Sequence, residues 1–269
     1  MKNAIAVILA IACAGLLVFG HLTWKDRTAV SPQPGTAAPS GGNAAAPDGT
    51  NGENTAEPAL TLEESRHFTK NWLAQARQSF ETKLLNGNPY KIAVVGSNAL
   101  GTNDAGLAQV FREQLQSVFK EAIEVPILTY DMTSTEYVES GNLDALVQEA
   151  ADFLILEPFI LKDNGPVTLD ETLANLDTIV NTVMEAKPDT VIALQSSYPL
   201  YNTSFYLQQE AALQEYATQK KLLYFDHWTA WPDTKDPALD GYVTPNRDAP
   251  NEQGIAVWSA YLLDFFVSK

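Results

Sequence analysis

Cysteine is nearly absent from this sequence. The single cysteine, Cys13, lies in an apolar run near the N-terminus, so residues 61–269 contain no thiol. This excludes disulfide bonds and cysteine chemistry there, and it is compatible with an oxidising compartment. The stretch from Gly96 to Gly101 also lacks the lysine of a phosphate loop and a full dinucleotide fingerprint. We therefore expect no nucleotide and no other cofactor.

Basic residues are scarce as well. The chain has 17 Lys and Arg against 33 Asp and Glu, which gives a formal net charge of −16. Such a field repels nucleic acid and anionic lipid, so we expect no nucleic-acid partner. Three acidic residues share one loop, but their spacing matches no known calcium loop, and we expect a solvated turn without metal: Asp233, Asp236 and Asp240.

An apolar segment opens the chain. Ala4 to Gly20 carries no charge, and Trp24 and Lys25 suit a membrane interface. We interpret residues 1–27 as a signal anchor, a single transmembrane helix that holds the rest of the chain on the extracytoplasmic side of the cell membrane. Two alternatives stay open, namely a cleaved signal peptide and a lipoprotein modified at Cys13 after the stretch Ala10 to Ala12.

A polar stretch follows the apolar segment. Residues 28–60 are dominated by Ala, Gly, Pro, Ser, Thr and Asn and show no apolar periodicity. Such a composition cannot bury enough apolar surface to offset the entropy of ordering, so we predict a disordered linker. Residues 61–269 then form one domain.

Helical and strand patterns alternate through this domain. A leading amphipathic helix is predicted over 62–84. Short apolar runs predict strands over 91–96, 124–130, 152–156, 190–195 and 222–225. Helical periodicity predicts helices over 105–122, 143–150, 169–186, 204–219 and 252–267. This order indicates an α/β fold, a flavodoxin-like three-layer α/β/α sandwich with a five-stranded parallel sheet, whose ligands bind at the carboxyl ends of the strands.

Two motifs at these carboxyl ends carry a family resemblance. The first is Val94 to Asn98 (VVGSN), after the first strand, and the second is Pro250 to Gly254 (PNEQG), before the last helix, with Trp258 beyond it. Together they resemble the SGNH (GDSL-type) hydrolases, which place a Gly-Asp-Ser nucleophile turn and an Asp-x-x-His-Pro-Asn stretch at these positions. The resemblance covers Lys91 to Phe266 and implies an SGNH-hydrolase fold and ester hydrolysis.

The chain departs from the family at the catalytic positions. Under the simplest alignment the nucleophilic serine falls on Asn98 and the histidine base on Ala249, while the orienting aspartate falls on Asn246. The family's oxyanion glycine has no clear match, and its oxyanion asparagine has only the displaced candidate Asn164. An amide cannot attack an ester, and a methyl group cannot accept a proton.

A rearranged site is the alternative to lost catalysis. Ser97 would be the nucleophile and His227 the base, Asp226 or Asp248 would orient the base, and Asn164 would help to bind the oxyanion. The competing interpretation is that Ser97 caps a turn and that the residues around His227 pack and hydrogen-bond their loop. We favour this structural role, because an active rearrangement needs three coordinated changes.

Aromatic residues gather near the fourth and fifth strands, where their faces suit a sugar ring or a core equally well: Tyr198, Tyr201, Phe205, Tyr206, Trp228 and Trp231. Two functions follow for the membrane-anchored domain. One is an SGNH-type esterase or deacetylase acting on acyl esters of an envelope glycan or lipid. The other is an inactive carbohydrate-binding or envelope-assembly module on the same fold. The missing triad favours the second.

Overall fold

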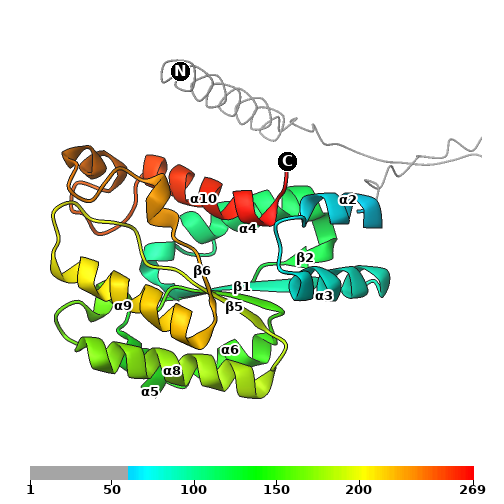
Figure 1. Cartoon of the computed structure of the whole chain (residues 1–269), viewed down its shortest axis with the longest axis horizontal. Coiled ribbons are helices and arrows are strands. Elements are labelled where there is room, and N and C mark those ends of the chain that lie inside the picture. The colour runs from blue at the N-terminus through cyan, green and yellow to red at the C-terminus, as the bar shows by residue number, and fades with distance from the viewer. Residues whose placement is uncertain (1–59) are drawn as a thin grey trace, which may run out of the picture. The chain divides into compact units, whose positions relative to one another are not determined.

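A computed structural model describes residues 60–269 (Figure 1). The signal anchor predicted over residues 1–27 and nearly all of the linker predicted over 28–60 lie outside the described residues. In the described part, no helix is both long and apolar enough to span a bilayer.

The domain is built around a parallel sheet with the strand order β2-β1-β4-β5-β6, and β3 also pairs with β1. The strands are β1 (Tyr90–Ser97), β2 (Ile123–Glu124), β3 (Ile127–Tyr130), β4 (Phe153–Leu156), β5 (Val191–Leu194) and β6 (Leu223–Tyr224). The longer helices are α3 (Ala74–Leu85), α4 (Leu107–Phe119), α6 (Asn142–Glu149), α8 (Leu169–Ala186), α9 (Phe205–Lys220) and α10 (Glu252–Phe266). Short helical pieces complete the described chain: α2 (Leu62–Phe68), α5 (Ser134–Glu139), α7 (Ile160–Asp163), η1 (Asn98–Leu100), η2 (Lys120–Ala122), η3 (His227–Ala230) and η4 (Pro237–Tyr242).

Helices cover both faces of the sheet, with α4 and α10 on one face and α6, α8 and α9 on the other (Figure 1). Alternate residues of β1 separate the two cores: Ile92 and Val94 face α4 and α10, whereas Ala93 and Val95 face α8 and α9. All of β4 and β5 is buried. A strand buried on both faces is a continuous apolar run, so the predicted three-layer α/β arrangement is confirmed.

Two predicted elements are interrupted. The strand expected over 124–130 divides into β2 and β3 because Pro126 lacks the N–H needed for a continuous ladder, although its carbonyl still accepts from Val94 N at 2.9 Å. The sheet therefore has six strands instead of five. The helix expected over 62–84 divides into α2 and α3, and the turn between them inserts Trp72 into the core, where its Nε1 donates to Phe266 O at 2.9 Å.

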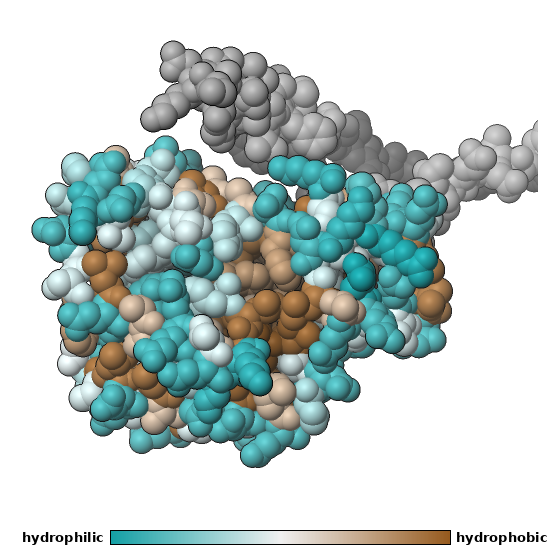
Figure 2. Space-filling model, in the orientation of Figure 1, coloured by the Kyte–Doolittle hydropathy of each residue, from teal (hydrophilic) through white to brown (hydrophobic). Residues whose placement is uncertain are grey.

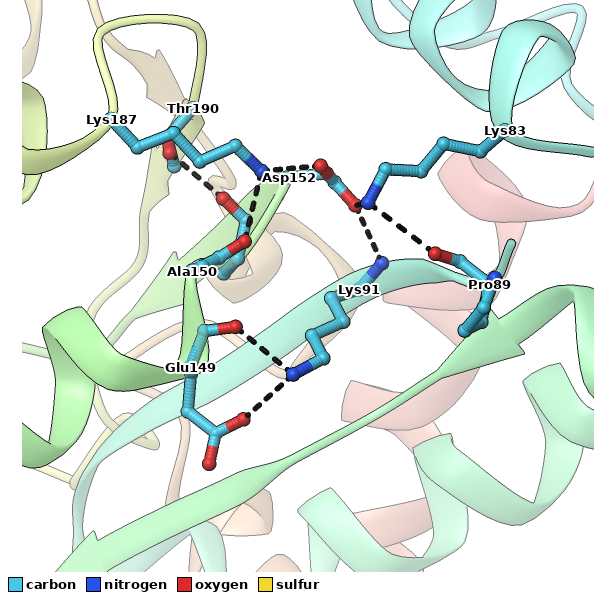
Figure 3. A network of polar contacts seen from close by, with 9 residues as sticks. Lys83, Pro89, Lys91, Glu149, Ala150, Asp152, Lys187 and Thr190 are labelled. Atoms are coloured by element: carbon cyan, nitrogen blue, oxygen red, sulfur yellow. Dashed lines mark hydrogen bonds and ion pairs between the residues drawn. The ribbon is translucent and has the colours of Figure 1, made fainter. Parts of the chain in front are cut away.

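A charged network closes the amino end of the sheet (Figure 3). Asp152, directly before β4, has a side chain that is 4% exposed. Its carboxylate accepts from Lys83 Nζ at 2.6 Å and from Lys91 N at 2.8 Å, and it also pairs with Lys187 Nζ. One carboxylate thus joins α3, β1 and the end of α8, on the edge of the sheet opposite to the predicted ligand site.

The sheet edge at β6 is only partly covered. Leu222 and Leu223 are half-buried, and the face shown in Figure 2 has an apolar area around this edge, within an otherwise mostly hydrophilic surface.

Candidate functional site

Ser97 is the last residue of β1 and lies at the carboxyl edge of the sheet, where its side chain is buried. Ser97 is 0% exposed, and its Oγ accepts from Ala99 N at 3.3 Å, which caps η1. The hydroxyl therefore has the capping contact expected from the structural interpretation. Asn98, at the position of the family's nucleophile, is exposed and begins η1.

Glu157 is the ionisable residue that is hydrogen-bonded to Ser97, and the sequence analysis did not predict it as a site residue. It directly follows β4, is 0% exposed, and accepts from Ser97 N through Oε2 at 2.7 Å. Burial raises the pKa of this carboxyl to about 7, against the lowering effect of the hydrogen bonds from Ser97, and Asp163 raises it further. The signal in the sequence was an acidic residue at the end of a wholly apolar strand.

Gly96 makes this contact possible. A Cβ placed on Gly96 would lie 2.5 Å from Glu157 O and 2.9 Å from Glu157 Oε2. Only glycine lets β1 and the residue after β4 approach this closely. Gly96 therefore leaves the space in which Glu157 packs against β1.

The neighbouring carboxylate, Asp163, has a structural role. It accepts from Ser134 N at 2.7 Å, from Ser134 Oγ at 2.6 Å and from Thr172 Oγ1 at 2.6 Å, which ties α5 to α8. Desolvation raises the pKa of Asp163 despite these bonds. The charge of Asp163 therefore disfavours ionisation of Glu157, and both buried carboxyls follow β4 in the chain.

His227 lies in the core at the start of η3. Its Nε2 lies 2.9 Å from Ser196 O and its Nδ1 lies 3.1 Å from Trp231 Nε1. Because a carbonyl only accepts and an indole N–H only donates, the ring is the neutral tautomer that carries its proton on Nε2. Its plane stacks on Trp258 with centroids 4.3 Å apart. Burial lowers the pKa of His227 to about 3.

Neither ring nitrogen of His227 is therefore free to receive a proton from a serine in this conformation. Within residues 60–269, no hydrogen bond joins His227 to Ser97. The fully buried imidazole instead connects the end of β5 to η3 and α10.

Within residues 60–269, none of the other predicted site residues forms a side-chain hydrogen bond with Ser97 or His227. Asn164 is exposed and follows α7, and its backbone forms an isolated bridge with Val167. Asp248 is exposed and accepts from Thr244 Oγ1 at 2.6 Å. Asp226 is half-buried, and burial raises its pKa, but the described chain shows no hydrogen bond from its carboxylate to His227. In the described part of the chain, no hydrogen bond links Asn164, Asp226 and Asp248 to one another.

The aromatic group is mainly core. Tyr198, Tyr206 and Trp231 are buried, and Tyr206 OH donates to Tyr198 O at 3.1 Å. Trp228 Nε1 donates to Ser197 O at 2.7 Å, so these rings close over the ends of β5 and β6. Phe205 is 44% exposed at the start of α9.

The acidic loop is held by local contacts. Asp233 accepts from Lys235 N at 2.8 Å, Asp236 from Ala238 N at 2.9 Å, and Asp240 pairs with Arg247 at 2.6 Å. Among residues 60–269 there is no group of three or more His, Cys, Asp or Glu placed to hold a metal ion.

Comparison with known proteins identifies the fold. No family model and no curated protein matches the sequence. A protein described as a GDSL-like lipase from Parabacteroides merdae has a TM-score of 0.54 at 11% identity, over 66% of this chain and 95% of its own. A catalytic mutant of an acetylxylan esterase from Geobacillus stearothermophilus has a TM-score of 0.54 at 17% identity, over 66% and 94%.

A third structure, described as a lipolytic protein of the G-D-S-L family from Desulfitobacterium hafniense, has a TM-score of 0.52 at 19% identity, over 65% of this chain and 98% of its own. Each of the three matches covers about two thirds of this chain and nearly the whole of the other. The predicted resemblance is thereby confirmed in three dimensions: this chain has the fold of the SGNH (GDSL-type) hydrolases.

Proposed function

We propose that this protein is a non-catalytic SGNH-fold module that binds, and does not cleave, a polymer of the cell envelope. The supporting observation is that the carboxyl edge of the sheet is closed: Ser97, Glu157 and His227 are each 0% exposed. A nucleophile must reach its substrate, and a base must lie within about 3 Å of the proton that it removes. The side chain of Ser97 is buried, and the described chain shows no hydrogen bond between Ser97 and the family-type base candidate His227.

The proposed location follows from the N-terminal sequence. The uncharged run from Ala4 to Gly20 anchors the chain in the cell membrane, and the polar residues 28–60 let the domain reach an envelope polysaccharide or lipid ester on the extracytoplasmic side. Fractionation of cells expressing the full chain, followed by protease treatment of intact cells, tests this. Recovery in the soluble cytoplasmic fraction would contradict the location.

Catalysis is tested with the full chain, a short-chain aryl ester and a serine-reactive phosphonate. We expect hydrolysis at the rate of buffer alone and no labelling. Ser97→Ala and Glu157→Gln are the comparison variants. Hydrolysis or labelling that disappears in Ser97→Ala would show that the protein is an enzyme. Retention on insoluble peptidoglycan, measured in parallel by sedimentation, tests the binding role.

One observation favours a second function, an esterase or deacetylase that acts on acyl esters. Glu157 touches Ser97, and burial brings the pKa of its carboxyl to about 7, which suits a general base. In this alternative the edge must first open to admit the ester. Activity that rises with pH around 7 and is lost in both Ser97→Ala and Glu157→Gln would support it over the binding module.

A further inference from the structure

A surface cavity lies between the loop after β5 and the loop that links η3 to η4. It has a volume of about 230 Å³ and is lined by Asn202, Thr203, Ser204, Leu207, Thr234 and Lys235. A backbone hydrogen bond from Asn202 N to Thr234 O, at 2.8 Å, joins the two loops across it. Both loops follow the carboxyl ends of strands, which is where doubly wound folds bind their ligands.

The polar side chains of this cavity are available to a ligand. Within residues 60–269, the side chains of Asn202, Ser204, Thr234 and Lys235 make no hydrogen bond or ion pair. They supply an amide, two hydroxyls and an ammonium group, and so offer several donors together with acceptors on the amide and hydroxyl oxygens. Leu207 adds one apolar contact. Most of the lining residues can therefore form hydrogen bonds to a ligand, and Lys235 is the one charged residue among them.

The size of the cavity limits the ligand. An engineered protein cavity of about 150 Å³ holds a benzene ring. A volume of about 230 Å³ therefore has room for one six-membered ring together with its polar substituents. A nucleotide or a longer acyl chain would extend beyond the lining residues.

We propose that this cavity binds one sugar unit of an envelope glycan. The amide of Asn202 and the hydroxyls of Ser204 and Thr234 pair with hydroxyl groups of the ring, and Leu207 contacts its apolar C–H face. Lys235, at the rim, donates to a further ring oxygen. The inference rests on the proposed function as a binding module and names the site and the ligand class that such a module would use.

Saturation-transfer NMR with the full chain tests the site, using N-acetylglucosamine, glucose and xylose as probes. We expect transfer to at least one of the three sugars, with weak affinity because a single ring makes few contacts. Leu207→Trp, which fills the cavity, should weaken that binding at least tenfold, and Ser204→Ala/Thr234→Ala, which removes two hydroxyls, should weaken it severalfold. Gln208→Ala is the matched control, since Gln208 is exposed on the same helix and does not line the cavity.

Absence of transfer to all three sugars would overturn the proposal, and so would equal binding by the wild type and Leu207→Trp. If Leu207→Trp does not fold, as judged by circular dichroism, the double-alanine variant decides. If the wild type and a folded variant are both retained on peptidoglycan but neither binds a free sugar, the proposed binding function would stand and the proposed sugar site would be wrong. Ester hydrolysis would contradict the proposed function, but it would not by itself contradict sugar binding here.

Discussion

Replacing Glu157 with glutamine should stabilise the domain at neutral and alkaline pH. The carboxyl of Glu157 is 0% exposed, and its Oε1 has no hydrogen-bond partner in the described chain. The titratable groups around it are Asp163, Tyr198 and Tyr206, none of which is cationic. An ionised Glu157 is therefore buried without an opposite charge, whereas glutamine keeps nearly the same shape and remains neutral.

The magnitude follows from the pKa of Glu157, which rises from its ordinary value of 4.5 to about 7 on folding. The folded state holds the proton over this interval while the unfolded chain releases it, so stability is full below pH 4.5 and declines as pH rises towards 7. Each pH unit in the interval contributes about 1.4 kcal/mol, so the complete loss is about 3 kcal/mol. Above pH 7 the loss stays constant.

Urea unfolding, followed by tryptophan fluorescence at several pH values, measures the effect. The lower limit is about pH 5.5, because the isoelectric point near 4.5 brings the net charge close to zero and favours precipitation. Between pH 5.5 and 8.5 the wild type should lose about 2 kcal/mol relative to Glu157→Gln. The buried His227 titrates in both proteins, so its contribution cancels in the difference.

Glu113→Gln is the matched control, because Glu113 is an exposed glutamate on α4. The free energy of unfolding of Glu113→Gln should change with pH in the same way as that of the wild type. Parallel pH curves for Glu157→Gln and the wild type, within about 0.5 kcal/mol, would refute the burial of an unpaired carboxyl at this position.

Three further predictions concern contacts that hold the fold. Asp152→Asn should cost about 2 kcal/mol at pH 7, less than for a fully buried ion pair because Lys83 and Lys187 are about one third exposed. The pKa of Asp152 is lowered in the fold, so this cost should shrink as pH falls below 4, and chemical denaturation of both proteins at pH 7 and pH 3 measures it. Gly96→Ala should cost about 1–3 kcal/mol, because the added methyl meets the backbone of Glu157; a thermal midpoint equal to that of the wild type would contradict the close approach. Thr168→Ala removes the capping box at the start of α8 and should cost about 1 kcal/mol by urea denaturation, with no change in the urea dependence.

Much of the architecture could be predicted from periodicity. The runs at 152–156 and 190–195 match β4 and β5 closely, because a parallel strand buried on both faces must be apolar throughout. Boundaries were less predictable. The pattern over 62–84 is compatible with one helix, and only the insertion of Trp72 among distant rings accounts for its division.

The environment of the site residues could not be predicted. Ser97 is hydrogen-bonded to a residue 60 positions away, and the His227 ring stacks on Trp258. Such pairings depend on how strands and helices pack, which no local pattern specifies. Glu157 escaped prediction for the same reason, since its neighbours are set by the close contact of β1 with the chain after β4.

By itself, the sequence determined the α/β class and the order of the elements, and it predicted the edge at which ligands would bind and the replacement of the family's triad, because these depend on local periodicity and residue type. The tertiary structure alone decided that the side chains of Ser97, Glu157 and His227 are buried in the core and that the loops after β5 and η3 form a surface cavity. Burial and the choice of hydrogen-bond partner are properties of the packed chain, where residues far apart in sequence exclude water from one another.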